Sequence, residues 1–100
     1  MPPWVKLDAT LLQDPTFQAL TPMTRLVYLS MCLEMGPRAG EWFTFPAKTA
    51  EKYGFQDKTL RRAVKELVQS RFIAMRRPSD GWKSEAYAPT EYQIITAWKE

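Results

Sequence analysis

Residues 57–70 restrict the fold of this chain most strongly, because they predict a helix with two unlike faces. At about 100° per residue, the aliphatic side chains of this segment fall within an arc of about 140°. Long polar side chains, all but one of them cationic, occupy about 100° on the opposite side. The first face must be buried in a core, and the second must stay accessible. The aliphatic residues are Leu60, Ala63, Val64, Leu67 and Val68, and the polar residues are Lys58, Arg61, Arg62, Lys65 and Gln69.

The polar face of this helix has two interpretations. For an arbitrary helix, a solvated surface is the commoner explanation of charge. Such surfaces usually mix signs, however, because opposite charges four residues apart stabilise a helix. A face that gathers cations without an acid among them is more typical of a surface that binds a polyanion.

Positive charge is concentrated around this helix. Residues 44–83 carry ten basic residues against four acidic ones, a net charge of +6. Residues 1–43 have a net charge of −1 and residues 84–100 a net charge of −2, so the whole chain carries +3. This asymmetry favours a polyanionic partner for the central segment.

The composition makes an enzyme or a metalloprotein unfavourable. The chain has no histidine, which removes Ser-His-Asp catalysis, Cys-His catalysis and every His-ligated metal site. Cys32 is the sole cysteine, so neither an intrachain disulfide nor a cysteine metal cluster can form. A Ser-Lys pair or paired carboxylates stay open, but no spacing points to either. We expect no catalytic activity, no cofactor and no metal.

Length and hydropathy predict one soluble domain. The 100 residues are close to the commonest domain size, and 45% hydrophobic residues suffice for a core. No apolar run reaches transmembrane length, and the N-terminus lacks the pattern of a signal peptide. We therefore expect a single cytoplasmic domain over residues 1–100, with no membrane attachment.

Capping and breaking residues define the first half of the domain. Asp14-Pro15 and Thr21-Pro22 each combine an N-cap residue with a proline at the first helical position. They predict an N-terminal arm with a short helix over residues 1–20 and a central helix over residues 21–35, which Gly36-Pro37 ends. The central helix is apolar on most sides, which predicts that it lies in the middle of the core.

The second half predicts a helix-turn-helix followed by a hairpin. A β-prone run at 41–45 precedes a helix over 46–53, in which Ala47, Ala50 and Tyr53 share one face. Gly54 fits the C′ position, where glycine adopts a positive φ at little cost, and Phe55 is expected in the core. With the basic helix these residues form a helix-turn-helix over 46–70. Strands at 72–77 and 87–95 then form a wing hairpin over 72–95.

This order of elements is that of a winged helix-turn-helix, an α+β fold with a three-helix core and a two- to three-stranded antiparallel β wing. Ala50 precedes Gly54 by four residues and Leu60 follows it by six, a spacing that lets two helices cross closely. The sequence resembles the small winged-helix domains of bacteria, phages and mobile elements, including the N-terminal domains of plasmid and phage replication initiators. The resemblance rests on Trp4-Val5-Lys6-Leu7, Leu20-Thr21-Pro22, Val27-Tyr28, Phe45 to Gly54-Phe55, Thr59-Leu60 to Ala63-Val64-Lys65-Glu66-Leu67, Phe72-Ile73 and Glu91-Tyr92-Gln93-Ile94.

This resemblance implies that the helix at 57–70 lies in the major groove of double-stranded DNA. Its early residues would face base edges, because arginine pairs bidentately with guanine and Gln56 can pair with adenine. Lys48 and Lys65 would contact phosphates. The residues implied to bind DNA are Lys48, Gln56, Lys58, Thr59, Arg61, Arg62, Lys65, Arg76, Arg77 and Lys83.

The residues of this set that lie in the predicted wing have two possible roles. Arg76, Arg77 and Lys83 can reach the flanking DNA backbone or the minor groove. Arg76 and Arg77 can equally pair with Glu85 or Glu91 across the hairpin.

Two positions depart from the family pattern. Where the family usually has Ser or Thr, this chain has Gln56, a poorer N-cap, so Asp57 can cap instead and shift the helix start by one residue. Where the family often has glycine before the Phe-Ile pair, this chain has Arg71. A left-handed arginine there would cost about 1 kcal/mol.

The resemblance implies a role in replication initiation or transcriptional regulation of a bacterium or mobile element. A homodimer, or a replication or transcription protein as partner, stays open. The alternative is a winged-helix docking module without direct DNA binding, in which Trp4, Trp82 and Trp98 form an exposed patch. If the chain binds DNA, core or rim packing is expected for Trp4, Trp42 and Trp98. Cys32 is expected as a small buried hydrophobe.

Overall fold

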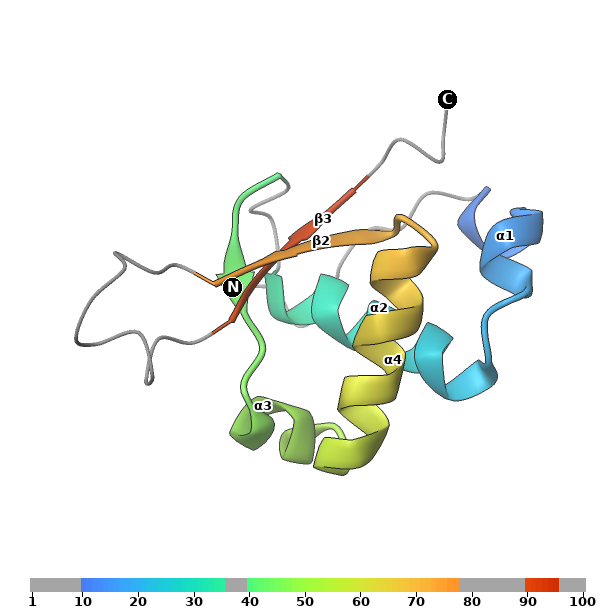
Figure 1. The fold of residues 1–100 in the computed structure, drawn as a ribbon. Coiled ribbons are helices and arrows are strands. Elements are labelled where there is room, and N and C mark those ends of the chain that lie inside the picture. The colour runs from blue at the N-terminus through green and yellow to red at the C-terminus, as the bar shows by residue number, and fades with distance from the viewer. Residues whose placement is uncertain (1–9, 36–39, 78–89, 96–100) are drawn as a thin grey trace.

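A three-stranded antiparallel sheet and a group of helices enclose one hydrophobic core (Figure 1). The computed structural model describes residues 10–35, 40–77 and 90–95. Within these residues the fold is α+β, compatible with the predicted architecture. A 3-10 turn, Leu11–Gln13, precedes the helices α1 (Pro15–Gln18), α2 (Pro22–Met35), α3 (Ala47–Lys52) and α4 (Asp57–Gln69), and the strands are β1 (Phe43–Thr44), β2 (Ile73–Arg76) and β3 (Glu91–Ile94).

The first two α-helices begin at the predicted caps. Asp14 precedes α1, and its Oδ2 accepts a hydrogen bond from the backbone N–H of Phe17 at 2.9 Å. Thr21 precedes α2, and its Oγ1 accepts one from the N–H of Thr24 at 3.3 Å. Each cap supplies an acceptor to a helix N–H that has no partner within the helix, so the local sequence is sufficient to start both helices.

The turn between α3 and α4 is built around a glycine, as predicted. Gly54 has a φ of +86°. Its N–H donates to the carbonyl of Glu51, and the N–H of Phe55 donates to the carbonyl of Ala50, both at 2.9 Å. These two bonds make a Schellman motif, which ends α3 and turns the chain toward α4. Phe55 is buried, as expected.

Helix α3 is shorter than the predicted range of 46–53 by one residue at each end. Pro46 has an extended backbone and occupies the N-cap position instead of entering the helix. Of the three residues predicted to share its inner face, Ala50 is buried and Tyr53 is half-buried, but Ala47 is exposed. A helix of six residues makes fewer than two turns, and Ala47 at its first position lines an open groove beside α4 instead of the core.

Both departures noted at the ends of the basic helix affect its geometry. Gln56 is the N-cap of α4 and makes no side-chain hydrogen bond there, and the helix begins at Asp57. The alternative in which Asp57 becomes the cap is therefore wrong. At the other end Arg71 has a φ of +65°, in the left-handed region. The N–H of Phe72 donates to the carbonyl of Leu67 at 3.0 Å, which closes a second Schellman motif with arginine where glycine is usual.

The predicted hairpin is present, and β1 extends it to three strands in the order β1-β3-β2. Strands β2 and β3 pair antiparallel, with Ile73 opposite Ile94 and Arg76 opposite Glu91. On the other side of β3, Phe43 pairs with Tyr92. The predicted strand at 87–95 is reduced to Glu91–Ile94 in the described residues. Residues 78–89, the loop of the predicted wing, lie outside the described residues.

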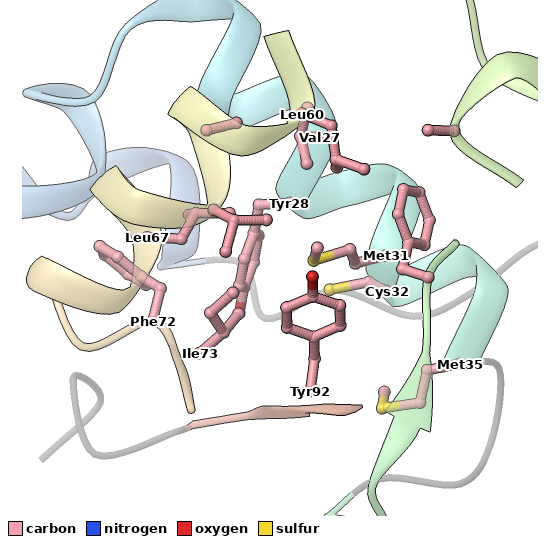
Figure 2. Close-up of a cluster of buried hydrophobic side chains, with 14 of the residues drawn as sticks. Val27, Tyr28, Met31, Cys32, Met35, Leu60, Leu67, Phe72, Ile73 and Tyr92 are labelled. Atoms are coloured by element: carbon pink, nitrogen blue, oxygen red, sulfur yellow. The ribbon is translucent and has the colours of Figure 1, made fainter. Parts of the chain in front are cut away.

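The core lies where α2, α4 and the inner face of the sheet meet (Figure 2). Phe17, Tyr28 and Phe72 form a triangle of edge-to-face rings with centroids 5.5 to 5.7 Å apart. Val27 and Leu67 have no exposed surface. Burial of each such aliphatic or aromatic side chain contributes about 1.5–3 kcal/mol. The packing of these side chains therefore fixes how α4 crosses α2.

Helix α2 is less completely buried than predicted. Val27, Met31 and other residues on one side are enclosed, but Met23 and Leu26 are 48% and 49% exposed. Helix α4 packs against α2, but Met23 only borders an open groove beside the start of α4, and Leu26 stays at the surface. The expectation that this helix lies in the middle of the core is therefore wrong for its N-terminal half.

Candidate nucleic-acid interface

Helix α4 has the two faces that its sequence predicts. Leu60, Ala63, Val64 and Leu67 are buried, and Val68 is half-buried. All members of the opposite face are exposed. We call this face the basic ridge; it consists of Lys58, Arg61, Arg62, Lys65 and Gln69.

An acidic residue at the start of α4 pairs with the ridge. Asp57 Oδ2 lies 2.9 Å from the Nη2 atom of Arg61, one turn further along. The two side chains are 56% and 80% exposed, so the pair contributes at most about 1 kcal/mol and is screened by salt. The guanidinium can therefore leave Asp57 for a stronger anion. The ridge itself contains no acid, but its surroundings are less purely basic than its composition suggests.

A carboxylate on the flank of α4 anchors that helix to the start of α2. Glu66 accepts hydrogen bonds from the Thr21 N–H at 3.3 Å and from the Thr21 hydroxyl at 3.2 Å, and it also accepts from the hydroxyl of buried Thr24. The same carboxylate thus supplements the Thr21 cap at the N-terminus of α2. This network could not be predicted from the sequence, because its partners lie more than 40 positions apart.

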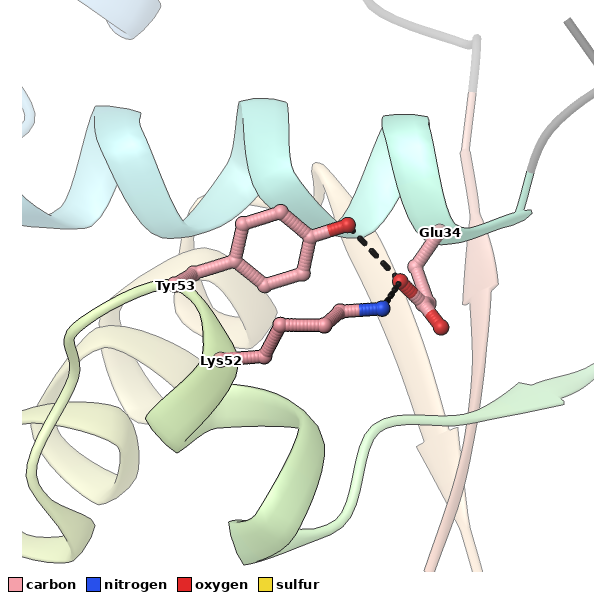
Figure 3. Close-up of polar contacts among 3 residues, drawn as sticks. All are labelled: Glu34, Lys52 and Tyr53. Carbon is pink, nitrogen blue, oxygen red and sulfur yellow. Dashed lines mark hydrogen bonds and ion pairs between the residues drawn. The ribbon is translucent and has the colours of Figure 1, made fainter. Parts of the chain in front are cut away.

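A second anchor joins α3 to the end of α2 (Figure 3). Glu34 Oε2 lies 3.0 Å from Lys52 Nζ and accepts a hydrogen bond from the Tyr53 hydroxyl at 2.7 Å. Partial burial, together with the hydrogen bond to the Glu34 carboxylate and its negative charge, raises the pKa of Tyr53 to about 12. The hydroxyl therefore stays protonated at neutral pH and continues to donate. The two anchors fix α3 and α4 to α2.

The residues at α4 that were predicted to bind DNA line two grooves, one on each side of the ridge. Gln56, Lys58, Thr59 and Arg62 line a groove between the N-termini of α2 and α4. On the other side of the ridge, Arg61 and Lys65 line a second groove, together with Arg77 from the sheet. Lys48 is exposed but belongs to α3 and lines neither of these two grooves.

The two arginines predicted to lie in the wing differ in their surroundings. The Arg76 guanidinium stacks on the ring of Trp42 at 4.1 Å, and its Nε lies 2.8 Å from Glu91 Oε1. This is the cross-strand pairing that was the alternative to a DNA contact for Arg76. Arg77 is exposed and lines the groove beside α4. Lys83, the third wing residue, lies outside the described residues, as do Trp4, Trp82 and Trp98.

Within the described ranges, no three acidic or cysteine side chains gather where a metal ion could bind. Cys32 is buried, and loss of solvent raises the pKa of its thiol to about 11, although a hydrogen bond with Tyr28 opposes this shift. None of the described helices is long and apolar enough to cross a membrane.

Comparison with known proteins gives a likeness in fold alone. No protein-family model matches the chain, and no curated protein matches it in sequence. A solved structure, described as "Structure of Rep-DNA complex", is similar with a TM-score of 0.67. The similarity covers 93% of this chain and 75% of that one, at 11% sequence identity. At this identity the two chains share an arrangement of helices and strands.

Proposed function

We propose that this chain is a winged-helix domain that binds double-stranded DNA and inserts α4 into the major groove. The observation that carries the proposal is the basic ridge, an exposed row of cations on the second helix of a helix-turn-helix. A major groove about 12 Å wide admits an α-helix. The similar fold found in a complex of Rep with DNA adds support.

Residues near the start of α4 are proposed to read the sequence. Arg61 and Arg62 can each present two N–H donors to the O6 and N7 atoms of guanine, and Gln56 can bond adenine in the same bidentate way. Lys58 and Thr59 complete this base-facing group. The absence of a Gln56 capping bond leaves its amide free to turn toward a base.

Other cations are proposed to hold the DNA backbone. Lys48 and Lys65 contact phosphates, which fixes orientation and adds affinity without specifying sequence. Arg77 and Lys83 carry the wing contact with the flanking backbone or minor groove. Arg76 is assigned a supporting position at the base of the wing, because Trp42 and Glu91 already engage it.

The biological role that fits this proposal is replication initiation or transcriptional regulation in a bacterium or mobile element, without catalytic activity. Support for replication comes from the name of the similar structure, Rep. Binding as a homodimer, or with a replication or transcription protein, would extend the contact along the duplex. The domain is proposed to work in the cytoplasm.

Fluorescence anisotropy of a labelled mixed-sequence duplex of about two helical turns tests the proposal. The titrations are run at several salt concentrations with the parent chain, with the ridge variant Arg62→Ala, and with the control Arg71→Ala. The control removes the same amount of positive charge from an exposed arginine outside the ridge. If about five phosphates are neutralised, the logarithm of the binding constant should fall with the logarithm of salt with a slope near −4 to −5.

We expect the ridge variant to lose at least about tenfold in affinity, because each bidentate arginine contact contributes about 1–3 kcal/mol. The control should stay within about threefold of the parent, since phosphate attraction alone changes. Equal losses in both variants would refute placement of DNA on α4. No binding at low salt by a folded chain would favour the docking-module alternative.

A further inference from the structure

An apolar groove lies between α4 and the inner face of the sheet. Leu60, Val64 and Val68 contribute its helical side, and Met75 and Tyr92 contribute the sheet side. The groove measures about 660 Å³ and is open to solvent. Met75 is 51% exposed, although it follows the core residue Ile73 on the same face of β2. The core therefore opens to the surface at this point, and a large apolar side chain stands in water.

The rim of this groove is mainly cationic. Arg61 and Lys65 line it from α4, Arg77 lines it from the end of β2, and Asp57 is the acid among its lining residues. Asp57 is already paired with Arg61 at 2.9 Å, which leaves Lys65 and Arg77 as the cations that face a ligand. An apolar floor beside a positive rim fits a partner that is apolar along one side and acidic along the other.

We propose that this groove docks an acidic amphipathic segment of a partner protein. Aliphatic or aromatic side chains of the segment would cover Val68 and Met75, and its carboxylates would pair with Lys65 and Arg77. A chain segment suits the groove better than a small molecule, because small-molecule sites bury most of their ligand and this groove stays open on one side. This surface is distinct from the tryptophan patch of the docking-module alternative.

Docking of such a segment would exclude DNA. Lys65 and Arg61 belong both to the rim of the groove and to the basic ridge. A carboxylate that neutralises them removes cations that the proposed DNA contact needs, and a bound segment covers one flank of α4. This regulatory consequence rests on the proposed function, whereas the docking itself does not.

Three labelled helical peptides of about four turns each serve as probes. The first places Leu along one face and Glu along the other, the second replaces every Glu by Lys, and the third has the composition of the first in scrambled order. Each is titrated into the full chain by anisotropy, and amide shifts of the protein are followed by two-dimensional NMR. We expect the acidic amphipathic peptide to bind at least about tenfold more tightly than the other two and to shift the amides of Val68 and Met75.

Met75→Glu and Arg77→Glu place negative charge in the floor and on the rim and should each weaken the acidic peptide by about tenfold. Leu12→Glu is the matched control, because Leu12 is a 59% exposed hydrophobe outside the groove. It should leave the affinity unchanged, and circular dichroism checks that all variants fold. Two substitutions in different elements keep the test informative if one variant is unstable.

Several results would overturn the docking proposal. These are equal binding of the scrambled peptide, preference for the basic peptide, shifts outside the groove, or a dimer of the chain that Met75→Glu dissociates. The last result would make a second copy the occupant. An added duplex should displace the acidic peptide. If the duplex itself does not bind, the proposed DNA function fails while peptide docking is still measured.

Discussion

Replacement of Arg71 by glycine should stabilise the domain. Arg71 occupies the C′ position of α4 with a φ of +65°, and the backbone bonds of the Schellman motif hold it there. A residue with a Cβ in this region costs about 1–2 kcal/mol. Glycine avoids that cost but makes the unfolded chain more flexible, which offsets about 0.4–1 kcal/mol. We expect a net gain of about 0.5–1 kcal/mol in the free energy of unfolding.

Urea denaturation followed by circular dichroism measures this gain, with thermal unfolding in parallel. For a domain of this size the midpoint temperature should rise by roughly 2–8 °C. Arg71→Ala is the matched control, because it removes the same charge and retains the Cβ. Its stability should stay close to that of the parent chain.

An equal gain in the alanine variant would refute the reasoning, since it would trace the effect to charge instead of backbone strain. A loss of stability in the glycine variant would mean that Arg71 makes a contact more valuable than the strain it carries. The reverse change, Gly54→Ala, should cost about 1 kcal/mol. Gly54 has a φ of +86°, and an added Cβ meets no atom within 4 Å, so the backbone conformation alone sets that cost.

Three further predictions address the anchors, the wing and the buried thiol. Glu66→Ala should lower the free energy of unfolding in urea by about 1–3 kcal/mol, because it removes the carboxylate that accepts from the Thr21 N–H and from the buried Thr24 hydroxyl, whereas Glu51→Ala on the surface should change it little. Arg77→Gln should make the salt slope of DNA binding shallower by about one, and Arg76→Gln should leave that slope unchanged; the opposite pattern would exchange their roles. The rate of Cys32 alkylation in the folded chain should rise with a midpoint near pH 11, and rapid labelling with a midpoint near 9 would contradict its burial.

The pKa of Cys32 also has a consequence for stability. Because the folded state raises this pKa from 9.0 to about 11, it holds the proton more tightly than the unfolded chain does. The corresponding contribution to stability is complete below pH 9 and is lost as the pH rises from 9 toward 11. The pKa of Tyr53 is raised from 10.0 to about 12, so its contribution to stability is likewise lost as the pH rises from 10 toward 12. Alkaline unfolding should therefore be partly relieved by Cys32→Ala.

Features with a local cause could be predicted from the sequence. Asp14, Thr21 and Gly54 act through backbone groups a few residues away, so their types and spacing were sufficient to predict two helix starts and one helix end. The two faces of α4 follow from helical periodicity. The strain at Arg71 could be predicted because the resemblance places an arginine where the family often has glycine.

Features that depend on which elements meet could not be predicted in this way. Glu66 reaches Thr21 across 45 positions, and Arg76 stacks on Trp42 only because β3 brings β1 and β2 together. Exposure of Leu26 likewise depends on which side of α2 receives α4. Periodicity shows that a face is apolar, but the tertiary arrangement decides whether that face is covered.

The same distinction applies to the candidate site. The cations of α4 could be identified from their helical spacing, and the structure places them on an exposed face. The different surroundings of Arg76 and Arg77, which are neighbours in sequence, required the strand register. From the sequence, a DNA contact was equally plausible for both arginines. The groove beside α4 is also a tertiary feature, because its floor combines residues from three elements.

The most direct test of the central claim is a map of backbone amide shifts in the isotope-labelled chain as unlabelled duplex is added. We expect the largest shifts to fall on Gln56 to Lys65 and on Arg77, with small shifts for α1 and for the buried end of α2. Shifts confined to the outer sheet around Trp42, or to the exposed side of α2 at Leu26, would contradict the placement of DNA on α4.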